Sequence, residues 1–104
     1  MRFKRRFSEV IERQLRLFAD EHAGLIADVK AAERQYERAP RDEAEERYGD
    51  YLDLVETATE TLADLRDHFS ATLPEEGDDE EYESAFNRAV RKRWPLFGLE
   101  IENR

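Results

Sequence analysis

The side chains with the clearest chemical potential in this chain are its two histidines and the acidic residues beside them. His22 directly follows Asp20 and Glu21, and His68 lies one helical turn after Asp64. Imidazole and carboxylate groups are ligands of zinc and iron centres. A di-iron helical bundle, however, needs a Glu-x-x-His pair on an inward helix face, and neither histidine belongs to one. We therefore expect no metal site and no bound cofactor.

Covalent and acid–base catalysis also find little support in the residue pattern. The chain has no cysteine, no glycine-rich phosphate loop, and no serine, histidine and acid arranged for nucleophilic attack. A pocket for an anionic substrate would need arginine or lysine on an inward face, and the arginines fall on outer positions of the helices expected below. The sequence therefore favours a non-catalytic protein. The alternative is a small dimeric helical enzyme with a pocket between its subunits.

The charge balance limits the classes of partner and the location. The 104 residues carry a formal net charge of -9, which would repel a phosphate backbone. Nucleic-acid binding is thus not expected, although a nucleic-acid-associated accessory role is a further alternative. Acidic residues are abundant and the positive charge is carried almost wholly by arginine, a balance that suits a salt-rich cytoplasm, as in a halophile, or a high-GC genome. No apolar stretch approaches the ~20 residues of a membrane span, and no secretory signal is evident, so we expect a cytoplasmic protein without membrane contact.

Apolar residues recur at alternating steps of four and three on both sides of Pro40. An average step of about 3.5 residues is typical of a coiled-coil seam and predicts helices at about residues 5–39 and 41–73. One polar residue, His22, occupies a seam position. The seam consists of Ile11, Leu15, Phe18, His22, Leu25, Val29, Ala32 and Tyr36, then Ala44, Tyr48, Tyr51, Val55, Ala58, Leu62, Leu65 and Phe69.

Pro40 marks the reversal between the two helices. Proline lacks an amide donor and disfavours the helical conformation for the residue before it. The resulting antiparallel hairpin pairs seam positions whose numbers sum to about 80. His22 would then face the small side chain of Ala58, and hydroxyls of Thr59 or Thr61 would bond its ring nitrogens. We interpret His22 and Ala58 as a polar layer that sets the register of the hairpin.

A third, shorter helix is predicted at about residues 79–94, after an acidic turn at 74–78. Tyr82, Phe86 and Trp94 give this helix an apolar face, and its acidic start and basic end suit the helix dipole. The tail at residues 95–104 is too apolar to remain in water. Its short alternating part suits an extended segment.

One shoulder of the hairpin matches the third helix in length, so we expect the helix to dock there. Its acidic start would meet the basic N-terminal residues 2–6, and its basic RKRW end would lie near Asp20 and Glu21. This docking shoulder consists of Phe3, Phe7, Val10, Leu17, Leu54, Thr61, His68 and Ala71.

The opposite shoulder is rich in small residues, which let helices approach closely. A second copy packed there would complete a four-helix layer, so we predict a homodimer, with another protein partner as a further possibility. The alternative is that the apolar tail folds back over this surface. The predicted dimer shoulder consists of Ala19, Ala23, Ile26, Gly49, Leu52, Thr59 and Ala63.

The sequence therefore predicts one all-α domain over residues 1–104. It would consist of a long, coiled-coil-like antiparallel helical hairpin, a shorter third helix and an apolar C-terminal tail. Its expected function is interaction or scaffolding as a homodimer.

Overall fold

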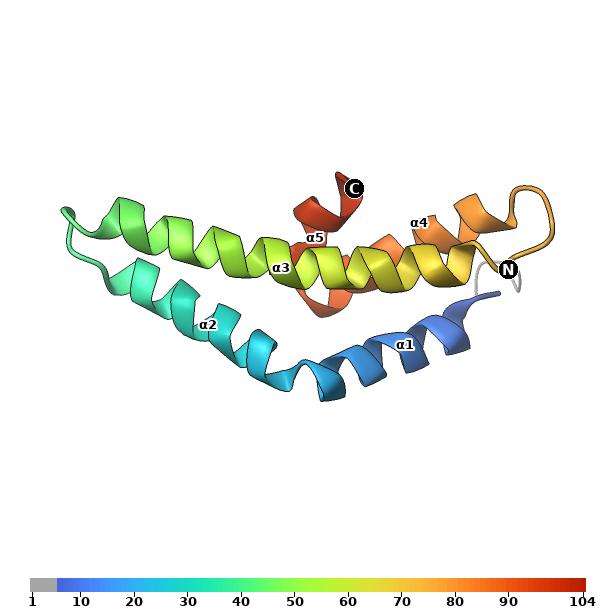
Figure 1. Cartoon of the computed structure of the whole chain (residues 1–104), viewed down its shortest axis with the longest axis horizontal. Coiled ribbons are helices and arrows are strands. Elements are labelled where there is room, and N and C mark those ends of the chain that lie inside the picture. Colours follow the sequence, from blue (N-terminus) through green and yellow to red (C-terminus); the bar gives the residue numbers. More distant parts are fainter. Residues whose placement is uncertain (1–5) are drawn as a thin grey trace.

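The computed structural model describes residues 6–104, which form helices and turns only. The all-α class predicted from the sequence is therefore confirmed for this part of the chain. The helices pack into a rod of 53 × 24 × 24 Å (Figure 1). Their bounds are α1 Ser8–Glu21, α2 Ala23–Arg38, α3 Ala44–Ser70, α4 Asp78–Arg93 and α5 Pro95–Glu102.

The predicted first helix is divided at His22 into α1 and α2, which meet at an angle (Figure 1). The backbone of His22 has φ -120° and ψ 32°, outside the helical range. Hydrogen bonds still flank the bend, because the His22 amide donates to the Phe18 carbonyl and the His22 carbonyl accepts from the Ile26 amide. Gly24 lies in the first turn of α2, where its low helix propensity weakens the rod. As a result α2 packs along α3, whereas α1 packs mainly against α4.

The chain reverses between α2 and α3 at Pro40. Ala39 has an extended backbone (φ -67°, ψ 138°), as expected for a residue before proline. After the turn, α3 runs back beside α2 (Figure 1). Three tyrosines, Tyr36, Tyr48 and Tyr51, cluster at this tip, with the ring centroids of Tyr36 and Tyr48 4.9 Å apart.

The third predicted helix is present as α4, and its ends follow local rules. Gly77 precedes it with φ 88°, a left-handed conformation that glycine adopts without a steric penalty. Its first turn is acidic and its last turn contains Arg91, Lys92 and Arg93, as the dipole favours.

The tail forms α5, so the expectation of an extended segment is wrong. Pro95 occupies the first turn of this helix, where its fixed φ favours a helix start. Phe97 and Ile101, four residues apart, are both fully buried on one face. α5 crosses α4 closely, since a Cβ atom at Gly98 would come within 2.8 Å of Cγ of Arg91.

The core lies where α1, α3, α4 and α5 meet. Helix α2 contributes only Val29 and Ala32 to the buried side chains, so the tip half of the rod is essentially a pair of helices. The largest fully buried side chains are Tyr82, Phe86, Phe97, Leu62, Ile101, Val29, Val90 and Thr59.

On α3, helices α4 and α5 cover the side opposite to the predicted docking shoulder, whereas Phe7 of that shoulder does pack against Tyr82 of α4. Leu17 of the predicted docking shoulder is 51% exposed and His68 is exposed as well, whereas Arg66 is only 4% exposed. One Nη atom of Arg66 donates to Oδ1 of Asn87 on α4 and to the carbonyl oxygen of Ile101 on α5. The aromatic residues of α4 and α5 have thus packed on the shoulder with smaller side chains, where bulky rings can approach α3 closely.

The predicted contact between the basic N-terminus and the start of the third helix is observed at Arg6. Its guanidinium forms two hydrogen bonds of 2.8 Å with the carboxylate of Asp78 and lies 3.7 Å from a carboxylate oxygen of Glu81. The hydrogen bond to Asp78 raises the pKa of Arg6. The other basic residues of this expectation, and Phe3 of the docking shoulder, lie outside the described residues.

Candidate functional site

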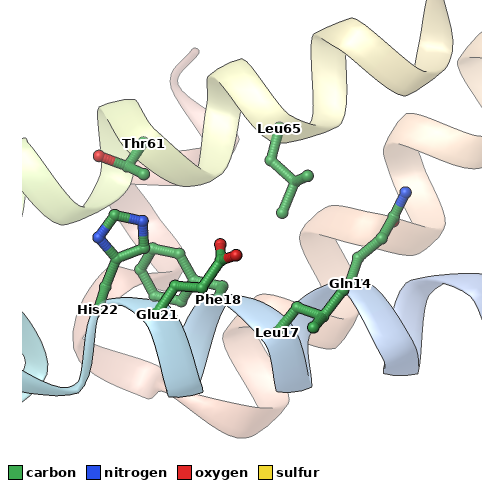
Figure 2. A pocket seen from close by; sticks show the side chains of 7 residues that line it. All are labelled: Gln14, Leu17, Phe18, Glu21, His22, Thr61 and Leu65. Atoms are coloured by element: carbon green, nitrogen blue, oxygen red, sulfur yellow. The ribbon is translucent and has the colours of Figure 1, made fainter.

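A pocket of about 150 Å³ lies between α1 and α3, next to the bend at His22 (Figure 2). The side chains of Phe18 and Leu65 point into the space between the two helices. Polar groups of α1 and α3 surround this apolar floor. The lining consists of Gln14, Leu17, Phe18, Glu21, His22, Thr61 and Leu65.

The half-buried imidazole of His22 forms one wall of this pocket. Its ring centroid is 5.0 Å from that of Phe18. The expected hydrogen bonds from Thr59 and Thr61 are not formed, because these hydroxyls donate to backbone carbonyls one turn earlier in α3. The structure thus places His22 beside Thr61 (Figure 2). Ala58 is fully buried, and its pairing with His22 as a register-setting layer stays a prediction.

The predicted dimer shoulder is divided by the packing of α4 and α5. Thr59 and Ala63 are 0% and 6% exposed, so they belong to the core of this chain and leave no free surface for a second copy. Of the predicted dimer shoulder on α3, only Gly49 and Leu52 remain exposed. Part of the shoulder is thus covered by the chain's own C-terminal helices, as the alternative interpretation expected.

The remaining members of the predicted dimer shoulder lie on α1 and α2 in a shallow groove of about 340 Å³. Trp94 and Arg93 at the end of α4 form its other rim. The guanidinium of Arg93 lies 4.9 Å from the ring centroid of Trp94, a cation–π contact. The groove is lined by Ala19, Ala23, Ile26, Ala27, Lys30, Arg93 and Trp94.

The basic end of α4 has different partners from those predicted. Arg91 forms an ion pair with Glu102 of α5, and Arg93 stacks on Trp94. Within residues 6–104, no ion pair joins this end to Asp20 or Glu21. Because α5 is helical and crosses α4 closely, it brings the carboxylate of Glu102 to Arg91.

The pocket is connected to the core through Gln14 and Tyr82. The Tyr82 hydroxyl donates a hydrogen bond of 2.7 Å to Oε1 of Gln14. Tyr82 has no exposed surface, and its ring centroid is 5.5 Å from that of Phe7 and 4.8 Å from that of Phe69. Burial raises the pKa of Tyr82 to about 12.

We expect the free energy of unfolding to fall between about pH 10 and pH 12, because the Tyr82 phenol ionises in the unfolded chain before it ionises in the folded chain. Below its ordinary pKa of 10.0 the phenol is neutral in the folded and unfolded chain, so its stabilising effect is fully present. Above that pH the unfolded chain ionises first, and the loss of stability reaches about 2–3 kcal/mol once the pH exceeds the folded pKa. Denaturant unfolding of wild type and Tyr82→Phe across this range measures the effect. A stability difference between the two that does not change with pH would contradict it.

The pocket could not be recognised as a site from the sequence pattern, which indicates His22 and Thr61 only as possible hydrogen-bond partners. Gln14 and Glu21 lie on polar positions of α1 that carry no signal by themselves. The one available signal was Leu17, an apolar residue outside the seam, and it was assigned to the docking of the third helix. The pocket also depends on the bend, which the seam pattern did not indicate.

The pocket beside His22 and the groove beside Trp94 lie on opposite sides of the bent segment formed by α1 and α2, as the helical spacing of their lining residues requires. Within residues 6–104, no three histidine or acidic side chains lie close enough together to hold a metal ion. None of the helices in this range has the length and apolar content needed to cross a membrane. Comparison of the chain with protein-family models, with curated proteins and with solved structures found no match.

Proposed function

We propose that this protein is a non-catalytic interaction or scaffolding protein that acts as a homodimer. In this proposal the α1–α2 arm and α3 form the two arms of one antiparallel hairpin. The observation that carries the proposal is the open groove beside Trp94. Helix α4 has 16 residues and spans about 24 Å of a rod 53 Å long. The chain therefore fills one face of its hairpin only in part, and the dimer surface would begin where α4 ends.

The groove has the composition that packing between two identical helices favours. Ala19, Ala23 and Ala27 recur every four residues, which gives α1 and α2 a strip of small side chains. Small side chains let a second helix approach closely. Exposed Leu52 on α3, at 40% exposure, would add apolar area beside this strip.

A second copy of the chain also suits the charges around the groove. A twofold axis near position 25 would pair residues of α1 and α2 whose numbers sum to about 50. Ala23 would then face the partner's Ala27, and Lys30 would face the partner's Asp20. Small residues would meet small residues, and opposite charges would meet at both edges of the contact.

The net charge of -9 on each copy opposes this association. Salt screens such repulsion over distances beyond about 10 Å at 0.1 M, while a close pair such as Lys30 and the partner's Asp20 is screened less. We therefore expect the dimer to become more stable as the salt concentration rises. This direction is opposite to that of an interface held together mainly by surface ion pairs.

The sharpest test is the substitution Ile26→Glu at the centre of the groove. The wild type should change from monomer to dimer with increasing micromolar concentration in sedimentation equilibrium. Ile26→Glu should weaken dimerisation at least about tenfold, because it buries an unpaired carboxylate. The control Leu17→Glu makes the same apolar-to-acid change on the opposite shoulder and should leave the dimer intact. A strictly monomeric wild type at both low and high salt would refute the proposal.

A charge exchange tests the orientation of the two copies. Lys30→Asp should weaken the dimer, and adding Asp20→Lys should restore it, because the exchanged charges would again face each other. If the double variant is no better than Lys30→Asp, the two copies do not pair about position 25.

A further inference from the structure

We propose that the pocket between α1 and α3 binds a small aromatic amine, meaning one aromatic ring joined by a short chain to a protonated amino group. This inference is independent of the dimer, since the pocket lies on the other side of the bent arm. It rests on the size of the cavity, its apolar floor and the hydrogen-bonding character of its mouth.

The size and floor of the pocket suit one aromatic ring. Its volume is about 150 Å³, which is similar to that of a cavity that accepts benzene. Phe18 at the floor is almost fully buried, and its ring is held edge-on by Trp94 at a centroid distance of 5.4 Å. A ligand ring would therefore meet a preformed aromatic surface, with Leu65 closing the opposite side (Figure 2).

The mouth of the pocket is richer in hydrogen-bond acceptors than in donors. Figure 2 shows the carboxylate of Glu21 directed toward the space between α1 and α3. No arginine or lysine of the described chain forms an ion pair with Glu21. The Thr61 hydroxyl already donates its proton to the Thr57 carbonyl, so it offers only lone pairs to a ligand.

Two further groups allow the amine to be oriented. The His22 side chain lines the mouth of the pocket, and its ring centroid lies 5.0 Å from that of Phe18. Gln14 uses its carbonyl oxygen to accept from Tyr82, so its amide group is held in place at the other end of the mouth. A ligand with its ring on Phe18 and its ammonium group at Glu21 would satisfy the acceptors, whereas a carboxylate there would meet Glu21 with the same charge. The net charge of -9 also attracts cations to the surface.

The test uses phenethylamine as the probe, with the fluorescence of Trp94, the one tryptophan, and the NMR signals of the His22 ring as readouts. Two comparison compounds separate the parts of the ligand: 3-phenylpropionate keeps the ring and reverses the charge, and butylamine keeps the charge without the ring. We expect saturable single-site binding of phenethylamine and at least about tenfold weaker binding of both other compounds.

Two matched pairs of variants assign the binding to this pocket. Glu21→Gln should weaken phenethylamine binding about fivefold, whereas Glu12→Gln, the same change on an exposed residue of α1, should not. Thr61→Phe should fill the cavity and abolish binding, whereas Thr57→Phe one turn earlier should leave it unchanged. Circular dichroism must show that each variant keeps the wild-type helix content.

Three results would overturn the proposal. The first is no saturable binding of phenethylamine to the folded wild type. The second is equal binding of 3-phenylpropionate, which would mean that the charge of the mouth plays no part. The third is an equal effect of Glu21→Gln and Glu12→Gln, which would assign the affinity to the general negative charge of the protein.

Discussion

Phe86→Ala is expected to lower the free energy of unfolding by about 3–5 kcal/mol, the usual cost of deleting a buried aromatic ring. Phe86 is fully buried on α4, and its ring centroid lies 5.9 Å from that of Tyr82. The core that contains Phe86 is built by α1, α3, α4 and α5, which pack on one another, so it cannot readily close the resulting cavity. Because domains of this size have a total stability of about 5–15 kcal/mol, a large share of it should be lost.

Urea denaturation followed by circular dichroism measures this loss. The matched control is Leu99→Ala on α5, because Leu99 is 77% exposed and its truncation should change stability by less than about 0.5 kcal/mol. If Phe86→Ala were as mild as Leu99→Ala, α4 would not be packed in the core as described. The pair therefore tests the position of the third helix independently of any function.

Local signals in the sequence were sufficient for the all-helical class, for α4 and for the turn at Pro40, but not for the division at His22 or for helix α5. Apolar spacing marked the helical segments, and Pro40 marked the reversal. The predicted third helix at 79–94 differs from α4, Asp78–Arg93, by one residue at each end. Such features depend on neighbouring residues along the chain, so a single sequence contains the information that determines them.

The bend at His22 could not be predicted from the same pattern. The apolar steps continue through Phe18, His22 and Leu25 without interruption, so periodicity alone predicts a straight helix. Near this position Gly24 was the only residue with a low helix propensity, and one glycine in a helix is often tolerated. The bend accompanies long-range packing that local periodicity does not report, because α1 packs against α4 while α2 packs along α3.

The side on which α4 and α5 dock was also beyond the sequence. Apolar residues occur on both shoulders, and the length match that favoured the predicted docking shoulder did not determine the side of α3 on which these helices pack. The deciding factor is volume, because the large rings of Phe86 and Phe97 pack beside small residues such as Ala63. This docking removed Thr59 and Ala63 from the candidate interface. Together with the bend, it also left the pocket beside His22 uncovered.

Arg66 illustrates the same limit. As a residue of an isolated hairpin it lies on an outer position, where a charged side chain normally remains in water. Once α4 and α5 are in place, its guanidinium is covered on that side. It then donates to Oδ1 of Asp67 at 2.8 Å and to Oδ1 of Asn87 at 3.0 Å. A surface charge has thus become the polar junction of three helices.

Arg66→Ala is expected to lower the free energy of unfolding by about 3 kcal/mol, from lost charged hydrogen bonds and lost packing of the aliphatic stem. This loss of stability is at the lower end of the range for breaking a buried ion pair. Asp67 is exposed, so water can solvate its carboxylate once Arg66 is removed. Arg66→Met keeps the stem and should lose less than the alanine variant. Arg66→Lys should not restore wild-type stability, because an ammonium group cannot reproduce the planar set of donors.

Chemical denaturation of the three variants separates packing from hydrogen bonding at this junction. Arg88→Ala is the matched control, because Arg88 is an exposed arginine on α4 and its loss should change stability by less than about 0.5 kcal/mol. An Arg66→Ala protein as stable as Arg88→Ala would show that Arg66 remains in water and that α5 does not lie over it. Thr59 and Ala63 would then be available to a second copy, and the dimer surface would extend along the whole of α3. The stability of one arginine variant therefore also determines how much of the hairpin face is open to a partner.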